Sequence, residues 1–262
     1  VYTLRGATNV DWEDMASGTD DDGKPVLYLG DIGDNNSNRK EIEVYQVPEP
    51  DGASADVAWV RYEFDYPDGP HDAEALLVDP RDHRIYIATK GLLGGELYEA
   101  PAAPSETAVN TLVPLRSVPA LVTSGDFSPD GSRLVLLTYL NAYWADGPTG
   151  ELHAFSVPLQ KQDEAIAFTK SGSAVLVGSE GSHSVVYEVP LPPPASNSQP
   201  ATSSPSPSPP ANSVVKRDSL ASAAFLAVLV IVTVGLWVLA SRWRRRSRRL
   251  RVGSPWDRPP DS

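Results

Sequence analysis

The sequence contains no cysteine, which excludes disulfide bonds, zinc–thiolate sites and thiol chemistry. It also lacks a Gly-x-Ser-x-Gly nucleophile elbow and a glycine-rich phosphate loop, so neither serine-hydrolase nor nucleotide chemistry is indicated. Before residue 190, no stretch of about ten residues follows the 3.6-residue period of an amphipathic helix. Short alternating apolar runs separated by Gly, Pro, Asp and Asn occur there instead, and they predict an all-β domain.

Basic residues are scarce, and the formal net charge is −12. Up to Ser213 there are 12 Lys and Arg against 31 Asp and Glu, whereas the remaining residues hold 10 against 3. An acidic surface of this kind repels nucleic acid and anionic headgroups. Cations, sugars and basic protein surfaces are therefore the expected partners of the first part of the chain, and no nucleic acid is expected.

Long uncharged apolar runs are absent except for Leu220–Ala240, which is long enough to cross a bilayer as a helix. An arginine-rich tail, 241–262, follows it directly and predicts a cytoplasmic C-terminus. The Pro- and Ser-rich segment 191–213 predicts an extended linker. We therefore expect a single-pass protein of the cell membrane with its N-terminal domain outside. Because Val1 is neither Met nor preceded by a signal peptide, we also expect further sequence upstream.

Four segments of the first 190 residues repeat one layout, in which an acidic or polar start leads into a strand, a turn and a second apolar strand. Additional strands follow each pair, as in 41–47 with 57–64 and in 96–100 with 111–117. Four strands per repeat predict a β-propeller over residues 1–190. The last repeat has three evident strands, and Val1–Leu4 reads as the outer strand of an earlier blade. We therefore expect four blades here within a ring of five or six. The paired segments are 13–16 with 26–29, 74–78 with 85–88, 123–127 with 134–137 and 164–168 with 174–177.

The element Phe127–Gly131, followed by an apolar strand, resembles the repeats of WD40-like and TolB-like bacterial propellers. The strings 9–14, 30–35 and 71–75 resemble exported propellers of high-GC bacteria. The resemblance implies a propeller over residues 1–190. It implies no single activity, because propellers include lactonases, phytase-like esterases, sugar dehydrogenases and binding modules.

Aligning the repeats by their turns places Glu13, Glu74, Thr123 and Glu164 in one column, where the inner strands begin. Like charges this close require a cation, raised pKa values or ion pairs. Carboxylate oxygens suit Ca²⁺ or Mg²⁺, so a channel-bound Ca²⁺ is one interpretation. A second is that the carboxylates accept hydrogen bonds from neighbouring blades, and a third is catalysis. The predicted metal-binding set is Glu13, Asp14, Asp34, Glu74 and Glu164.

The remaining candidates lie at the same ends of the strands. His71 and Asp72 are the catalytic candidates, because a histidine beside carboxylates can act as a base. His83 and His183 fall in turns and His153 in an outer strand, and they receive no role. The predicted ligand-binding residues are Trp12, Asp31, Lys90, Tyr139 and Glu180.

Two functional classes follow from these features. The first is a membrane-anchored binding or scaffold module outside the cytoplasm, whose partner is a protein, a glycan or a small ligand. The alternative is a metal-dependent hydrolase, lactonase-like or phytase-like, with its site at the acidic column.

Overall fold

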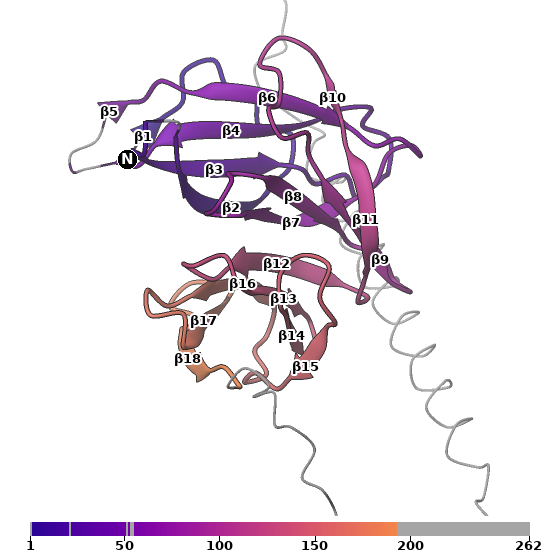
Figure 1. Ribbon diagram of the computed structural model, residues 1–262, viewed down its shortest axis with the longest axis vertical. Coiled ribbons are helices and arrows are strands. Elements are labelled where there is room, and N and C mark those ends of the chain that lie inside the picture. Colours follow the sequence, from indigo (N-terminus) through magenta and orange to yellow (C-terminus); the bar gives the residue numbers. More distant parts are fainter. Residues whose placement is uncertain (1, 21, 51, 53–54, 193–262) are drawn as a thin grey trace, which may run out of the picture. The chain divides into compact units, whose positions relative to one another are not determined.

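The computed structural model describes residues 2–20, 22–50, 52 and 55–192, and within these ranges every regular element is a β-strand (Figure 1). No helix suited to crossing a membrane occurs in these ranges. The predicted transmembrane helix, the basic tail and the linker from residue 193 onward lie outside the described residues.

The first blade contains the antiparallel strands β2, β3, β4 and β6, with β2 innermost. A short strand from the second repeat, β10, extends this sheet by pairing in parallel with β6. Apolar residues alternate along β3 and β4, as expected for strands buried on their packed face. The strand bounds are Trp12–Thr19 (β2), Pro25–Asp31 (β3), Ile42–Pro48 (β4), Val60–Asp65 (β6) and Asn110–Thr111 (β10).

Blades 2 and 3 are antiparallel sheets of four strands, and blade 4 has three strands in the described part of the chain. Blade 2 is built from β7 (Ala73–Val78), β8 (Ile85–Thr89), β9 (Gly95–Glu99) and β11 (Val113–Val118). Blade 3 is built from β12 (Val122–Phe127), β13 (Leu134–Thr138), β14 (Ala142–Ala145) and β15 (His153–Phe155). Blade 4 is built from β16 (Asp163–Phe168), β17 (Ala174–Ser179) and β18 (Tyr187–Pro190).

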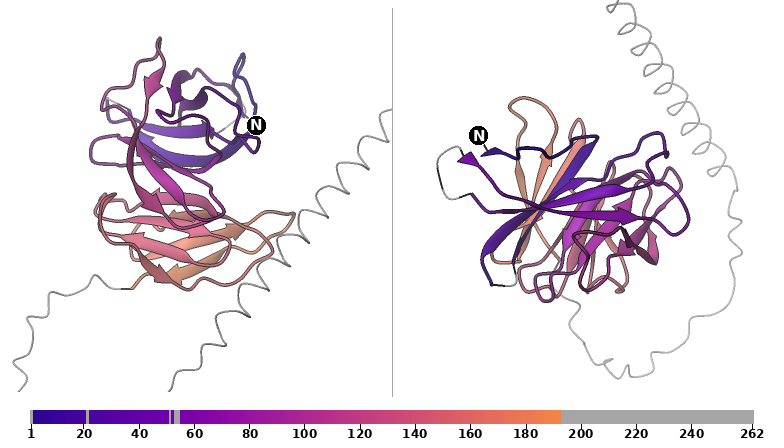
Figure 2. Two further views of the ribbon diagram at one scale, coloured as in Figure 1. Left: turned by 90° about the vertical axis from the view of Figure 1, so that its right-hand side faces the viewer. Right: turned by 90° about the horizontal axis from the view of Figure 1, so that it is seen from above.

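The blades pack face to face in chain order, because the inner strand of each contacts the inner strand of the next (Figures 1 and 2). Three separate apolar cores fill the three junctions. Tyr28 and Leu76 belong to the core between blades 1 and 2, Leu136 to that between blades 2 and 3, and Ile166 to that between blades 3 and 4. The predicted four-blade propeller over residues 1–190 is thus confirmed for the described residues.

The N-terminal strand differs from its prediction. We expected Val1–Leu4 to be the outer strand of an earlier blade, yet β1 (Tyr2–Thr3) pairs in parallel with β5 (Ala55–Asp56), within the first repeat. The β4–β6 connection therefore holds the start of the chain. A further blade upstream stays a prediction.

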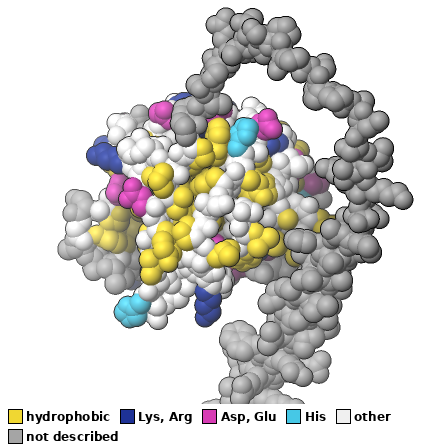
Figure 3. Space-filling view, turned by 90° about the horizontal axis from the view of Figure 1, so that it is seen from below, with side chains coloured by type: hydrophobic (Ala, Val, Ile, Leu, Met, Phe, Trp, Pro, Cys, Tyr) yellow, Lys and Arg dark blue, Asp and Glu magenta, His cyan; other side chains and the backbone are white. Residues whose placement is uncertain are grey.

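Blades 1 and 4 each keep one sheet face that is not covered by a neighbouring blade within the described residues. On blade 1, the side chain of Met15 is 56% exposed. On blade 4, Leu176 and Val186 are exposed beside Ala165 and Ala167. Hydrophobic side chains also gather on the surface that Figure 3 shows. The two faces border a common groove, which is described below.

Candidate functional site

The inner strand of every blade carries the same irregularity near its start. In blade 2, Ala73 pairs with Thr89 and Ala75 with Ala88, so that Glu74 is left between them as a β-bulge. Thr123 and Glu164 occupy the same place in β12 and β16, and in β2 the residues Glu13 and Asp14 lie opposite a single partner. Bulges redirect side chains. The predicted column is therefore confirmed as a structural feature.

Asp14 is not directed toward the other column carboxylates. Its Oδ2 atom accepts hydrogen bonds from the backbone N–H of Leu76, 3.0 Å away in blade 2, and of Gly125, 3.4 Å away in blade 3. The Ser124 hydroxyl donates to the same carboxylate at 3.3 Å. Burial raises the pKa of Asp14 to about 7, although these hydrogen bonds lower it. Asp14 therefore joins three blades, which is the structural role considered as an alternative for the column.

Two further hydrogen bonds connect blade 3 to blade 4 in the same manner. Asp126 accepts from the backbone N–H of Phe168 at 2.7 Å, and the Ser124 hydroxyl oxygen accepts from that of Ile166 at 3.2 Å. Burial raises the pKa of Asp126 to about 6. These inter-blade bonds use residues one to three positions after the column, and the hydroxyl of the column residue Thr123 also donates to the backbone oxygen of Asp163 in blade 4 at 2.7 Å.

Four side chains form a hydrogen-bonded chain across blades 2, 3 and 4. The Lys90 ammonium donates to Glu74 and to the hydroxyl oxygen of Tyr139, the latter at 2.9 Å. The Tyr139 hydroxyl in turn donates to Glu164 Oε1 at 3.1 Å. Lys90 and Tyr139 follow β8 and β13 directly, where the second strand of each blade returns to the start of the inner strands. We call Glu13, Glu74, Lys90, Tyr139 and Glu164 the mouth cluster.

Lys90 and Glu74 form a mostly buried ion pair. Burial alone would lower the pKa of Lys90, but its hydrogen bonds to Glu74 and Tyr139 reverse the effect and raise it, so the lysine is charged at neutral pH. Burial raises the pKa of Glu74 to about 7 against the influence of Lys90, and repulsion by Glu164 and Asp72 adds to the rise. Near neutral pH, Lys90 is therefore fully charged, whereas Glu74 is only partly ionised.

Glu13 enters the mouth cluster from blade 1 and makes no hydrogen bond or ion pair within the described ranges. Partial burial, followed by repulsion from Glu74, Asp11 and Asp72, raises its pKa to about 8. The loop after β3 passes close to this carboxyl group, because a Cβ atom at Gly33 would lie in contact with the side chains of Glu13 and Asp11. Glu13 is thus an unpaired carboxyl group that is mostly protonated at pH 7 and ionises slightly above neutral pH.

Glu13 and Glu164 lie at one end of a groove of about 570 Å³ between blades 1 and 4. This volume is within the range of small-molecule sites. No Lys or Arg is among the described residues that line it. A ligand in the groove would therefore meet carboxyl groups at one end, the exposed indole of Trp12, and apolar side chains along the rest of the groove. Its apolar lining comes from Met15, Leu29, Ala165, Ile166, Ala167, Leu176 and Val186.

The predicted residues Asp31, Asp34 and Glu180 do not belong to the mouth cluster. Asp31 is fully buried, accepts the backbone N–H groups of Val10 and Asp11, and pairs with Arg39 at 2.8 Å. Asp34 accepts the backbone N–H of Arg39. Glu180 is exposed after β17. Of the five predicted ligand-binding residues, Lys90 and Tyr139 lie in the mouth cluster and Trp12 lines the groove, whereas Asp31 holds a loop.

The predicted metal-binding set is not gathered at one point. Within the described residues, no three His, Asp or Glu side chains are placed to hold one metal ion. The physical reason is that Asp14 and Asp34 bind backbone N–H groups and Glu74 binds Lys90, so their oxygens already have donors. These contacts replace the cation that the sequence suggested, and the Ca²⁺ prediction gains no support.

The catalytic candidates lie beside the mouth cluster. His71 Nε2 is 3.0 Å from Asp68 Oδ1 and 3.2 Å from the Tyr98 hydroxyl. Asp72 accepts the backbone N–H of Asp34 at 2.7 Å, and burial raises its pKa. Both residues line a pocket of about 370 Å³ that also contains Lys90. His71 is thus held by an acid and a phenol, while Asp72 is engaged by the backbone.

Comparisons with known proteins give no family model and no curated protein that matches this chain. Solved structures are similar at low identity. A putative 6-phosphogluconolactonase from Bacteroides uniformis is 10% identical, with a TM-score of 0.43 over 73% of this chain and 71% of its own. A gluconolactonase from Xanthomonas campestris is 14% identical, with a TM-score of 0.45 over 73% of this chain and 61% of its own. The Dos1 propeller is 14% identical, with a TM-score of 0.38 over 68% of this chain and 44% of its own.

Proposed function

We propose that the propeller is a binding module whose groove between blades 1 and 4 takes a ligand with a positively charged group and an apolar body. The observation that carries the proposal is the lining of this groove: Glu13, Glu164 and the buried Asp14, an exposed indole, and apolar residues, without Lys or Arg among its described lining. A cation beside Glu13 relieves the repulsion that raises its pKa. The face of Trp12 adds a cation–π contact, and the apolar length accepts the rest of the ligand.

The placement of this module is part of the same proposal. We assign it to the WD40-like and TolB-like propellers on the Phe127–Gly131 element, and we place it outside the cell membrane on the linker 191–213 and the helix 220–240. In that location the acidic domain is held away from anionic headgroups. Its ligand then comes from outside the cell.

The test is a comparison of two probes that share an aromatic body and differ in charge, benzyltrimethylammonium and benzyl alcohol. We expect calorimetric titration at pH 8.5 to show about tenfold tighter binding of the cation, because each partly exposed carboxylate contributes about 0.5–1 kcal/mol. Glu13→Gln should lower the affinity for the cation about fivefold and leave that for the alcohol unchanged. As a control, Glu106→Gln lies outside the groove and should change neither affinity. Equal affinities for the two probes would contradict the proposal.

A hydrolase is the second candidate, and the raised pKa values of Glu74 and Glu13 favour it. A carboxyl group with a pKa of about 7 or 8 can donate a proton to a leaving group near neutral pH. Turnover of lactones, esters or phosphoesters by the whole chain, lost in Glu74→Gln, would favour this function over the binding module. The binding proposal expects no turnover with any of these substrates.

A further inference from the structure

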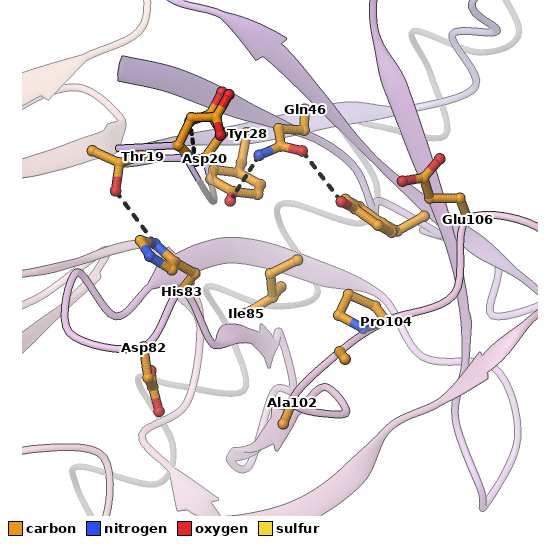
Figure 4. A pocket seen from close by; sticks show the side chains of 13 residues that line it. Thr19, Asp20, Tyr28, Gln46, Asp82, His83, Ile85, Ala102, Pro104 and Glu106 are labelled. Atoms are coloured by element: carbon orange, nitrogen blue, oxygen red, sulfur yellow. Dashed lines mark hydrogen bonds between the residues drawn. The ribbon is translucent and has the colours of Figure 1, made fainter. Parts of the chain in front are cut away.

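A second pocket, of about 420 Å³, lies where the inner strands of blades 1 and 2 end, at the opposite end of β2 from the mouth cluster (Figure 4). One wall is formed by the sheet of blade 1. The other is formed by the β7–β8 turn and by residues 102–106, after β9. Its volume is again within the range of small-molecule sites. It shares no lining residue with the groove between blades 1 and 4.

Three polar side chains from adjacent strands are held in place along the blade 1 wall. The Gln46 amide donates to the Tyr28 hydroxyl oxygen at 3.2 Å, and the Tyr62 hydroxyl donates to the Gln46 carbonyl oxygen at 3.2 Å. Figure 4 shows Tyr28 and Gln46 on the opposite side of the pocket from His83 and Ile85. These two hydrogen bonds fix the orientation of the Gln46 amide, whose second N–H and carbonyl oxygen can serve an uncharged polar ligand.

His83 has a positive φ, as glycines have in the first turns of the other blades, but it lies one position later in its turn than Gly131 does in the turn of blade 3. Each turn between the first two strands of a blade has one residue with a positive φ: Gly23 (75°), Gly131 (67°), Gly172 (69°) and His83 (59°). A side chain in this region costs about 1 kcal/mol or more, and such strain is typical of functional positions. This backbone conformation places the imidazole at the pocket, where Nδ1 lies 3.5 Å from the Thr19 hydroxyl.

Four carboxylates line the pocket: Asp20 and Asp82 accept backbone N–H groups of their own turns, Asp22 pairs with Lys24, and Glu106 is exposed. Asp20 accepts the backbone N–H groups of Asp22 and Lys24, at 3.0 and 2.8 Å. Asp82 accepts that of Arg84 at 3.1 Å, and Figure 4 shows its carboxyl group pointing away from His83. The middle of the pocket is therefore lined by neutral polar groups on one side and by Ile85, Ala102 and Pro104 on the other.

We propose that this pocket binds a sugar ring. A sugar has the two surfaces that the pocket matches: hydroxyls, which can exchange hydrogen bonds with Gln46 and His83, and an apolar C–H face, which can pack on Ala102 and Pro104. The ring comes either as a free monosaccharide or as the terminal residue of a glycan, because both present the same hydroxyls. The site is independent of the groove and of the function proposed for it.

The test uses the full chain and four probes: D-glucose, D-galactose and their methyl glycosides. We expect at least one to bind with a Kd of about 1 mM or tighter in a titration followed by NMR. His83→Gly should weaken that binding at least about tenfold, because it removes one hydrogen-bonding group and one wall of the pocket. It should leave the free energy of unfolding unchanged or slightly increased, because glycine suits a positive φ.

Lys170→Ala, in the corresponding turn of blade 4, is the matched control and should not change sugar binding. Binding of the methyl glycosides as tightly as the free sugars identifies a terminal glycan residue as the ligand, and binding of the free sugars alone identifies a monosaccharide. Two results would overturn the proposal. One is a Kd above about 10 mM for all four probes. The other is an unchanged sugar affinity in a folded His83→Gly variant.

Discussion

Replacing Asp14 with alanine is expected to destabilise the propeller by about 3–5 kcal/mol. The substitution removes the shared acceptor of Leu76 N–H and Gly125 N–H and of the Ser124 hydroxyl, which come from two other blades. Each buried donor left without a partner costs about 1–3 kcal/mol. The release of a buried carboxyl group with a raised pKa offsets part of this loss.

Urea unfolding of wild type, Asp14→Ala and Asp130→Ala measures this effect. Asp130 is an informative control because it also accepts several hydrogen bonds, but within one exposed turn. We expect Asp130→Ala to cost about 1 kcal/mol, since water replaces its contacts. If Asp14→Ala cost no more than Asp130→Ala, Asp14 would not be the residue that joins blades 1, 2 and 3.

Replacing Lys90 with methionine is expected to cost up to about 1.4 kcal/mol more at pH 8 than at pH 5, because one pH unit separates pH 8 from the wild-type pKa of Glu74, about 7. At pH 8 the change leaves Glu74 as a buried carboxylate without its cation. The pKa of Glu74 is already raised to about 7 with Lys90 present, and it rises further without it. At pH 5 the carboxyl group holds its proton in the folded state, so the penalty for burying a charge disappears.

The double variant Lys90→Met/Glu74→Gln separates this effect from lost packing. Because it removes both charges, it should recover most of the stability at pH 8 and should show little dependence on pH. The free energy of unfolding from urea titrations at pH 5 and pH 8 gives all four values. An equal loss at both pH values in Lys90→Met would show that the lysine acts through packing and not by neutralising Glu74.

The sequence was sufficient to predict the blades. The first two strands of each blade and the turn between them lie in one short stretch of chain, and this layout recurs from blade to blade. The alternation of apolar residues and the turns such as Ser128–Gly131 specify their strands locally. The same alignment predicted the column of Glu13, Glu74, Thr123 and Glu164, which the repeated bulges confirm. It also placed Lys90 and Tyr139 at the same end of the blades.

The roles of these residues were harder to predict, because they depend on contacts between distant parts of the chain. Asp14 and Glu13 are adjacent carboxylates with the same local signal, yet Asp14 finds donors in Leu76 and Ser124 while Glu13 finds none. The five residues of the predicted metal set therefore make different contacts, and metal binding by them stays a prediction. His83 received no role as a turn residue, and no signal for one existed in the sequence, because the residue of its turn that aligns with Gly131 is Asp82. The place of Gln46 at the second pocket could not be predicted, because it depends on the pairing of β3, β4 and β6.

The most direct test of the proposed binding site is the pH dependence of cation affinity. Glu13 has a pKa of about 8, so it is largely neutral at pH 6 and ionised at pH 9. A quaternary ammonium ion keeps its charge throughout this range. Calorimetric titration with benzyltrimethylammonium should therefore show affinity rising about fivefold from pH 6 to pH 9 in wild type and staying nearly constant in Glu13→Gln. An affinity for wild type that did not change, or that fell, over this range would contradict a cation site at Glu13.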